Sequence, residues 1–347
     1  MIWLTWRQLR AQSIAAASVL VLFAALLLST GIVLAHQETS SGLSACDGTV
    51  ACHNAATSFL GLVRGGQLML VFYAGIAITY AVAALIGMFW GAPLIAREIE
   101  TGTFRLAWNQ SVSRTRWVIV KLGLVGLAAM ATSGLVGWMT SWWAHPIYRA
   151  GSLAGNGFGP FQPSRITPLA FGSQGIVPLG YAAFAFAVGV TAGLLIRRTI
   201  PAMALTLAVF AFVQIAWPNW VRPHLITPLR YTRPFSISRL SEVMMSTSNS
   251  AMTVRDSATK PGAWILSNVS VKPDGQTFTG PATHACRAHG IQACNASIMR
   301  LHLHQVVTYQ PASRFWELQG IETGIFLAIA IALAGFCAWW IRRRRLN

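Results

Sequence analysis

LMLVFYAGIAITYAVAALIGMFW, residues 68–90, carries no charged side chain, and this stretch decides the class of fold. A helix needs about 20 apolar residues to cross the hydrocarbon core of a bilayer, so the run is long enough to span it. The whole chain agrees, because 54% of its 347 residues are hydrophobic and only 10% are charged. Ordinary soluble domains contain about 25% charged residues. The sequence therefore predicts a membrane protein.

Five further apolar runs extend this prediction along the chain. The six runs cover residues 14–35, 68–90, 118–142, 176–196, 200–217 and 321–341. The fifth is the shortest, but Arg197 and Arg198 before it favour a turn between two full spans over a re-entrant hairpin. Lys121, near the start of the third run, is expected to reach the membrane interface. We predict an all-α membrane protein with six transmembrane helices, five within residues 13–217 and the last within 321–347.

Basic side chains near the ends of these runs predict the orientation. One set of segments holds Arg7, Arg10, Arg97, Arg105, Arg114, Arg116, Lys121, Arg197, Arg198 and Arg342 to Arg345. Because Lys and Arg are enriched in cytoplasmic segments beside spans, both termini are predicted in the cytoplasm. Residues 36–67, 144–175 and 218–320 are then outer loops. The net charge of +17 is explained by this asymmetry and by anionic lipid, so no nucleic-acid partner is expected.

The first residues have the pattern of a short amphipathic helix. Trp3 and Trp6 lie three positions apart, as do Arg7 and Arg10 on another face. Such a helix lies in the headgroup plane, with its aromatic side chains toward the acyl chains and its arginines toward phosphates. We predict an interfacial helix over residues 1–12 that contacts membrane lipids. The alternative is that these arginines only flank the first span.

Four of the five cysteines form two close pairs on the predicted outer side. Cys46 and Cys52 fall in the first outer loop, and Cys286 and Cys294 fall in the last. An oxidising exterior permits disulfides, so the bridges Cys46–Cys52 and Cys286–Cys294 are predicted. The large loop 218–320 is then disulfide-tied, with a small extracellular subdomain inside it. Cys337 is expected to be a buried apolar residue.

The sequence lacks the motifs of several enzyme classes. It has no G-x-x-x-x-G-K-[ST] loop, and none of its three lysines follows a glycine-rich loop. It also has no H-E-x-x-H or G-x-S-x-G motif, so no catalytic residue, cofactor site or metal site is predicted. Histidines of the last loop, such as His302 and His304, are expected to be solvated, with a soft-metal site as the alternative. Glu322 is placed near the outer mouth of the last span, and no carboxylate is expected deep in a span, which disfavours ion-coupled transport.

Two small-residue motifs occur inside the spans. Gly87-x-x-x-Gly91 ends the second apolar run, and Gly189-x-x-x-Gly193 lies in the fourth. Such motifs let two helix backbones approach closely. They are common in membrane helices, so close approach within the chain and a role in dimerisation both remain open.

The polar segment 91–117 directly follows the apolar run 68–90. After Pro93 the chain is expected to continue as a short helix with Leu94, Ile95 and Ile99 on one side. The charged residues Arg97, Glu98 and Glu100 are expected to project toward water. Gly102 can end this helix, because glycine tolerates the left-handed cap conformation. Residues 103–108 are then expected to form an exposed apolar cluster, and exposed apolar side chains flanked by charges suit a surface that docks another protein. The alternative is a solvated hairpin whose apolar residues lie on lipid.

A family resemblance enters at this segment. AREIETGT at residues 96–103, SVSR at 111–114 and KL at 121–122 resemble the inner loop of permease subunits of type-2 ATP-binding-cassette (ABC) transporters. Those permeases carry an acidic residue four positions before Gly-Thr, as Glu98 does here, and then a Pro-Val-Ser-Arg-like stretch. The chain departs from the pattern at Ser111, where proline is frequent, and in its large last loop.

The resemblance implies a multi-pass permease in the cell membrane of a bacterium. It also implies a second permease copy, identical or different, and a separate ABC ATPase subunit that holds ATP and Mg. The residues expected to couple to that subunit are Arg97, Glu98, Glu100, Thr101, Gly102, Thr103, Phe104 and Arg105. Family members mostly export lipids, peptides or drugs, and some confer multidrug or self-resistance. The charge-poor spans fit an apolar or amphipathic cargo.

A function of another class is the alternative. The large outer loop also suits a membrane receptor or sensor that binds a ligand outside and transports nothing. A neighbouring reading frame with a phosphate-loop motif would favour the exporter, and a neighbouring kinase or regulator would favour the sensor.

Overall fold

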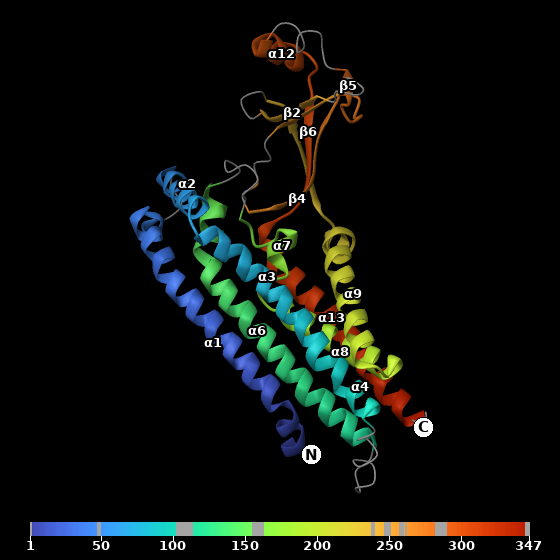
Figure 1. Ribbon diagram of the computed structural model, residues 1–347. Coiled ribbons are helices and arrows are strands. Elements are labelled where there is room, and N and C mark those ends of the chain that lie inside the picture. Colours follow the sequence, from blue (N-terminus) through green and yellow to red (C-terminus); the bar gives the residue numbers. More distant parts are fainter. Residues whose placement is uncertain are drawn as a thin grey trace.

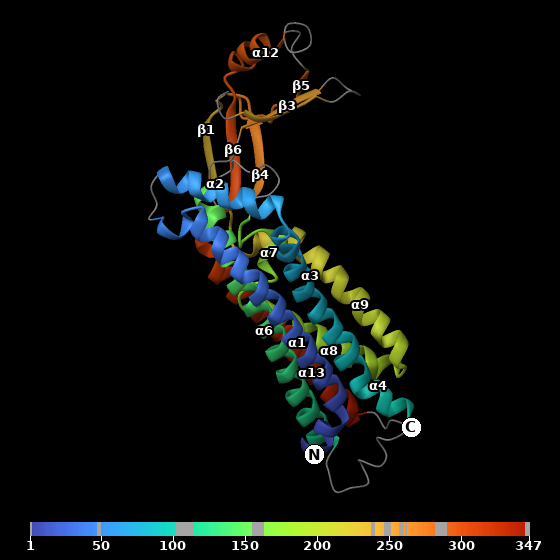
Figure 2. The same ribbon diagram turned by 60° about the vertical axis from the view of Figure 1, so that its left-hand side comes forward.

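The computed structural model describes residues 2–46, 50–101, 114–154, 163–236, 240–245, 251–256, 260, 262–281 and 290–343. Six long helices form a bundle, and a part that contains all the strands sits at one end of it (Figure 1). The long helices are α1 (Ile2–Ser40), α3 (Leu68–Ile86), α6 (Arg114–Ala154), α8 (Val177–Ile196), α9 (Thr199–Ala216) and α13 (Phe315–Arg343). Both ends of the chain lie at the other end of the bundle (Figures 1 and 2). We call these two ends of the bundle the strand end and the termini end.

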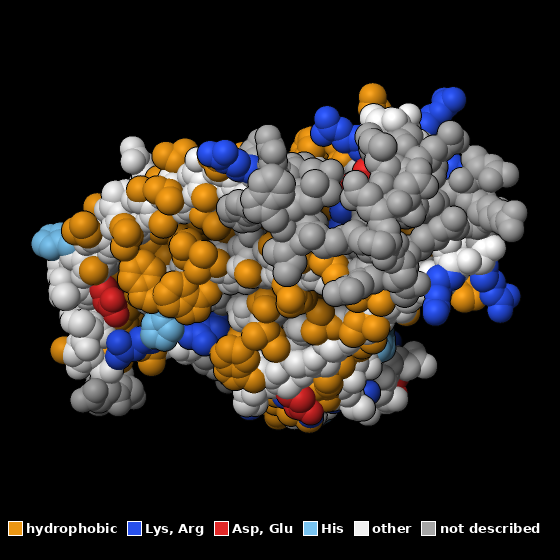
Figure 3. Space-filling model, turned by 90° about the horizontal axis from the view of Figure 1, so that it is seen from below, with side chains coloured by type: hydrophobic (Ala, Val, Ile, Leu, Met, Phe, Trp, Pro, Cys, Tyr) orange, Lys and Arg blue, Asp and Glu red, His pale blue; other side chains and the backbone are white. Residues whose placement is uncertain are grey.

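Six helical segments are long and apolar enough to cross a membrane, and each coincides with a predicted run. They are Ser13–Ser40, Leu68–Glu100, Ile119–Ala154, Val177–Ile196, Thr199–Leu225 and Ala312–Arg343. Large apolar side chains on their outer faces are exposed, with Ile200 at 79% and Leu70 at 73%. Viewed from below, hydrophobic side chains cover much of the visible flank, and Lys and Arg are more widespread than Asp and Glu (Figure 3). The prediction of six spans is confirmed.

Two π-helical turns lengthen the second and fifth spans. The turn η2 (Gly87–Gly91) joins α3 to α4 (Ala92–Glu100), and η3 (Trp217–Val221) joins α9 to α10 (Arg222–Leu225). Pro218 lies inside η3 and Pro93 follows the end of η2 by two residues, and a proline lacks an N–H and clashes with the preceding helical turn. A π-turn accommodates this without breaking the helix. The predicted short helix after Pro93 is therefore present as a continuation of α3.

The helix α8 is central to the bundle. Of its span, 72% is buried, against 17% for the span of α1. A Cβ atom at Gly189 would lie 2.3 Å from the carbonyl oxygen of Gly87, and one at Gly193 would lie 2.4 Å from that of Ala92. These contacts are too short for any side chain, so the backbones touch. The motifs Gly87-x-x-x-Gly91 and Gly189-x-x-x-Gly193 thus contact each other, and their close approach lies within the chain.

The strand end carries two small antiparallel sheets, which the all-α prediction did not include. One has the order β1 (Leu229–Pro234), β6 (His304–Gln310), β4 (Trp264–Val271), and Leu229 is paired with Tyr309. The other has the order β2 (Leu240–Met245), β3 (Ala251–Asp256), β5 (Gly280–Pro281). The helix α12 (Gly290–Met299) supplies Ile298 to a separate apolar core with Phe235, Val254, Phe278 and Leu303. The predicted outer subdomain thus has a core of its own.

Shorter helices complete the strand end. They are η1 (Leu43–Ala45), α2 (Val50–Gly65), α7 (Pro168–Phe171) and η5 (Ala312–Arg314). The helix α2 buries Phe59 and Leu60 in the same apolar cluster as Ile147 of α6. This packing fixes the connection between the first two spans.

The predicted interfacial helix is not a separate element. Residues 2–12 belong to α1, which runs without a break from Ile2 to Ser40. At about 1.5 Å per residue its 39 residues are about 58 Å long, so the helix is longer than the hydrocarbon core of a bilayer. Arg10 is exposed, and the side chains of Trp3, Trp6 and Arg7 lie outside the described part.

The predicted disulfides have different outcomes. No bridge joins Cys46 to Cys52, which corrects that prediction. Cys52 is buried in α2, whereas the carbonyl of Cys46 accepts a hydrogen bond from Arg149 at 3.0 Å, so the two residues are held in different environments. Cys286 lies outside the described residues, and its bridge to Cys294 stays a prediction. Cys337 is buried, as expected.

Candidate functional site

The short helix α4 lies at the termini end and is amphipathic. Its residues Ala92, Ile95 and Ala96 are buried, and Arg97 and Glu100 are exposed. The spacing of the buried residues places them on one face of a helix. That face packs against α8, whose glycines allow the close approach described above. The predicted division of α4 into an apolar and a charged side is confirmed.

Glu98 connects α4 to α6. Its carboxylate forms an ion pair and a hydrogen bond with the ammonium group of Lys121. The side chain of Lys121 is only 5% exposed, and that of Glu98 is 16% exposed. An ammonium group this far from water needs a counter-charge. Two expectations are therefore corrected, because the ammonium group of Lys121 is buried against Glu98 instead of reaching outward, and Glu98 turns toward the protein.

Glu100 connects α4 to α9. Its carboxylate accepts hydrogen bonds from the backbone N–H of Thr199, at 3.0 Å, and from the hydroxyl of Thr199. Thr199 is the first residue of α9, and Arg198 before it makes no side-chain cap. A carboxylate at a helix N-terminus satisfies an otherwise free N–H and faces the positive end of the helix dipole. Glu100 therefore caps a helix from another part of the chain.

Thr101 closes α4 and is the last described residue before the gap at 102–113. The backbone N–H of Thr101 donates to the carbonyl of Arg97 at 3.0 Å, and its hydroxyl donates to the same oxygen at 2.8 Å. Gly102, Thr103, Phe104 and Arg105, which the sequence analysis also assigned to coupling, lie outside the described residues. The described start of the segment predicted to couple is thus a short helix attached to α6, α8 and α9. A force applied to α4 would reach three long helices.

A second charged cluster lies at the strand end. Arg222 donates from Nε to Oε2 of Glu322 at 2.8 Å and from Nη2 to Oε1 at 2.9 Å. Both side chains are 0% exposed. The hydroxyl of Tyr181 donates to Oε1 of Glu322 at 2.6 Å, and Arg222 also donates from Nη1 to the carbonyl of Pro168 at 2.9 Å. The guanidinium lies 4.4 Å from the centre of the Phe171 ring.

This cluster joins four elements of the strand end. Arg222 begins α10 directly after the turn η3, while Tyr181, Glu322 and Pro168 belong to α8, α13 and α7. A buried ion pair is tolerated only when further hydrogen bonds satisfy its remaining donors and acceptors, as they do here. The sequence analysis placed Glu322 at the outer mouth of its span and overlooked Arg222. The sequence offered one signal for this pair, because a glutamate at the edge of an apolar run needs a partner for its charge.

The described residues contain no group of three or more His, Cys, Asp or Glu side chains placed to hold a metal ion. The charged side chains described above instead form ion pairs and a helix cap between helices of the bundle. Such contacts position helices relative to one another.

Comparison with known proteins gives the family. No curated protein and no solved structure matches the chain. The family model described as ABC-2 membrane transporter related matches residues 17–222. This range is more than half of the chain, includes α4 and the glycine contacts, overlaps the first five spans and ends at Arg222. The chain therefore belongs to the ABC-2 membrane transporter related family.

Proposed function

We propose that this chain is the membrane-spanning permease subunit of an ATP-driven exporter. ATP is hydrolysed on a separate ABC subunit that docks on residues 91–117, and a second permease copy completes the transporter. The termini end then faces the cytoplasm of a bacterial cell, where ATP is present. The family match supports a permease component of an ABC transporter. The remaining parts of the proposal rest on the geometry of α4.

One observation carries the proposal, namely the attachment of α4 to three spans. Glu98 holds α6, Glu100 holds α9, and backbone contact holds α8. Arg97 remains exposed beside them. A docked ATPase that displaces α4 would therefore displace the bundle, which is what conversion of ATP hydrolysis into movement requires.

The cargo is proposed to be apolar or amphipathic. The outer faces of the helices are apolar, and the charged pairs described above are engaged within the protein. A charged cargo would need unpaired polar groups along a path through the membrane. A drug, lipid or peptide that already partitions into the bilayer does not need such polar groups.

The test is to co-express the chain with an ABC ATPase subunit encoded beside it. We expect the two to purify together and Glu98→Ala to lower the ATPase activity of the complex severalfold while membrane insertion is kept. Glu317→Ala is the matched control, because Glu317 is an exposed glutamate at the strand end. Normal ATPase activity of the Glu98→Ala complex would contradict the role of α4, and purification without any ATPase would favour the receptor function.

A further inference from the structure

The helix α4 carries three charged side chains, and two of them have a partner within the chain. Glu98 is paired with Lys121, and Glu100 accepts hydrogen bonds from Thr199. Arg97 is exposed, and among the described residues no carboxylate forms an ion pair with its guanidinium group. Arg97 is therefore the charged side chain of α4 that remains available to another molecule.

The place of Arg97 on the helix explains this difference. Ile95 and Ile99 pack in one apolar cluster with residues of α8. At 3.6 residues per turn, Arg97 lies about 160° around α4 from each of these two residues, on the opposite side of the helix. Glu98 and Glu100 lie on the two flanks of Arg97 and reach α6 and α9. The two glutamates thus attach the helix to the bundle, while Arg97 faces away from it.

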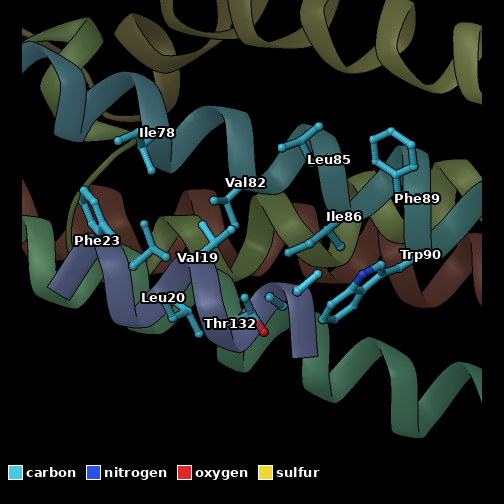
Figure 4. A pocket seen from close by; sticks show the side chains of 13 residues that line it. Val19, Leu20, Phe23, Ile78, Val82, Leu85, Ile86, Phe89, Trp90 and Thr132 are labelled. Carbon is cyan, nitrogen blue, oxygen red and sulfur yellow. The ribbon is translucent and has the colours of Figure 1, made fainter. Parts of the chain in front are cut away.

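The end of α4 extends beyond the hydrocarbon part of the bilayer. Side chains of α3 and η2 from Ile78 to Trp90 line an apolar pocket beside α1, and the lining includes no charged residue (Figure 4). Leu68, the first residue of α3, precedes Arg97 by 29 positions, which is about 41 Å of depth at a helix tilt of about 20°. The hydrocarbon core accounts for about 30 Å of this depth and one headgroup layer for about 6 Å. We therefore expect Arg97 in water, past the lipid phosphates.

A second arginine makes this surface net positive. Arg198 is exposed and directly precedes Thr199, whose backbone N–H and hydroxyl donate to Glu100. Glu100 follows Arg97 by three positions, and residues at this spacing are neighbours on a helix surface. Two arginines therefore flank one carboxylate that is already engaged. A complementary partner carries carboxylates, with which a guanidinium forms two parallel hydrogen bonds.

We propose that Arg97 is the side chain through which α4 contacts the ABC ATPase subunit, and that its partner there is an Asp or Glu carboxylate. This inference rests on the proposed function and names the contact at the same site. Glu98 and Glu100 are not that contact, because both carboxylates are engaged within the chain. A lipid phosphate also attracts a guanidinium, but the depth of Arg97 favours a protein partner in water.

The first test measures binding of the ATPase subunit encoded beside the chain to the permease in phosphatidylcholine nanodiscs. Arg97→Glu should weaken binding by about tenfold, because it sets two carboxylates against each other. Its thermal unfolding should stay unchanged, since the fold uses the backbone carbonyl of Arg97, which accepts two hydrogen bonds from Thr101. Arg342→Glu is the matched control, because Arg342 is an exposed arginine of α13 at the same end. Equal weakening by both substitutions would overturn the assignment to Arg97.

A second test identifies the partner group by chemical cross-linking. A water-soluble carbodiimide joins an amine directly to a carboxylate, and the chain has only three lysines. Lys121 is buried, and Lys260 and Lys272 lie beside β4 at the strand end. Arg97→Lys should therefore give a cross-link from position 97 to an Asp or Glu of the ATPase subunit, and the native chain should give none. A cross-link from Arg342→Lys but not from Arg97→Lys would overturn the proposal.

The outcomes separate this inference from the proposed function. If the native chain binds the ATPase subunit and Glu98→Ala lowers its activity, but Arg97→Glu binds normally, the exporter stands and Arg97 is not the contact. If Arg97→Glu has an effect only in nanodiscs that contain phosphatidylglycerol, the partner is an anionic lipid headgroup and the inference is overturned. Failure of the native chain to bind the ATPase subunit would overturn the proposed function and the inference with it.

Discussion

Two charged pairs stand at opposite ends of one bundle, and the protein encloses them to different degrees. At the strand end, Arg222 and Glu322 are 0% exposed and share a phenol and a backbone carbonyl as further partners. At the termini end, the carboxylate of Glu98 is 16% exposed and belongs to the nine-residue helix α4. The first pair joins elements inside the fold, and the second joins a short helix to the rim of the bundle.

The difference indicates which end of the bundle is able to move. Separating a fully buried pair leaves two charges without water, which costs several kcal/mol. Separating Glu98 from Lys121 also leaves a buried ammonium group without its counter-charge, but the 16% exposed carboxylate of Glu98 regains some contact with water, so the cost is smaller. We therefore expect the strand end to be the more rigid one, and under the proposed function the termini end is where a docked subunit would displace an element. Predictions that test this contrast are ordered below by the size of the expected effect.

The largest effect is expected from Glu322→Ala. This substitution leaves Arg222 buried without its counter-charge, and we expect a loss of about 3–5 kcal/mol in the free energy of unfolding. Thermal unfolding in detergent measures it. Glu317→Ala on the same helix is the control, since that side chain is exposed. Similar melting of both variants would mean that the pair does not anchor the strand end.

A double substitution sharpens the same test. Buried ion pairs can often be replaced by apolar residues of similar volume without loss of stability. Arg222→Met together with Glu322→Leu should therefore be more stable than Glu322→Ala alone. If the double variant is the less stable one, the hydrogen bonds to Tyr181 and Pro168 contribute more than the charge pair itself.

The next largest effect is expected where α4 meets α8. A methyl group at Gly193 would lie 2.4 Å from the carbonyl oxygen of Ala92, so Gly193→Ala must push the two helices apart. Overpacking of this kind costs about 1–3 kcal/mol. Gly324→Ala is the control, because a methyl group there meets nothing within 4 Å. Equal stability of the two variants in thermal unfolding would show that α4 already separates from α8 freely.

Much of the bundle could be predicted from the sequence, because spans depend on local apolar content. The charge-poor apolar runs predicted the spans, and the pattern around Leu94, Ile95 and Ile99 predicted the helix α4. The glycine motifs predicted close approach, but only the fold shows that Gly87 and Gly91 meet Gly189 and Gly193.

The pairings could not be predicted, since they depend on contacts between distant residues. Arg222 and Glu322 are 100 positions apart, and Glu100 is 99 positions from Thr199. Hydropathy and charge patterns depend on residues that are neighbours in the sequence, so they do not predict contacts between distant residues. Lys121 therefore looked like an interfacial residue, and Cys46 and Cys52 looked like a bridge because they are close in the chain.

A smaller effect is expected from reversing the pair at the termini end. Glu98→Lys places two like charges together, and adding Lys121→Glu restores an opposite pair. We expect a coupling free energy of about 1–2 kcal/mol from the double-mutant cycle, measured by thermal unfolding. The ATPase activity of the complex should fall in each single variant and recover in the double one. Recovery of stability without recovery of ATPase activity would mean that Glu98 contacts the ATPase directly.

The smallest effect is expected from Glu100→Ala, which removes the cap of α9 at an exposed position. We expect little change in unfolding temperature and faster hydrogen exchange at the backbone N–H of Thr199, because that group then faces water. Glu100→Gln keeps an oxygen acceptor and should exchange more slowly than Glu100→Ala. If Glu100→Ala nevertheless lowers the ATPase activity of the complex more than Glu98→Ala does, movement passes from α4 to α9 rather than to α6. The termini end would then still be the end that moves. The contact that transmits the movement would be the cap at Thr199 and not the ion pair between Glu98 and Lys121.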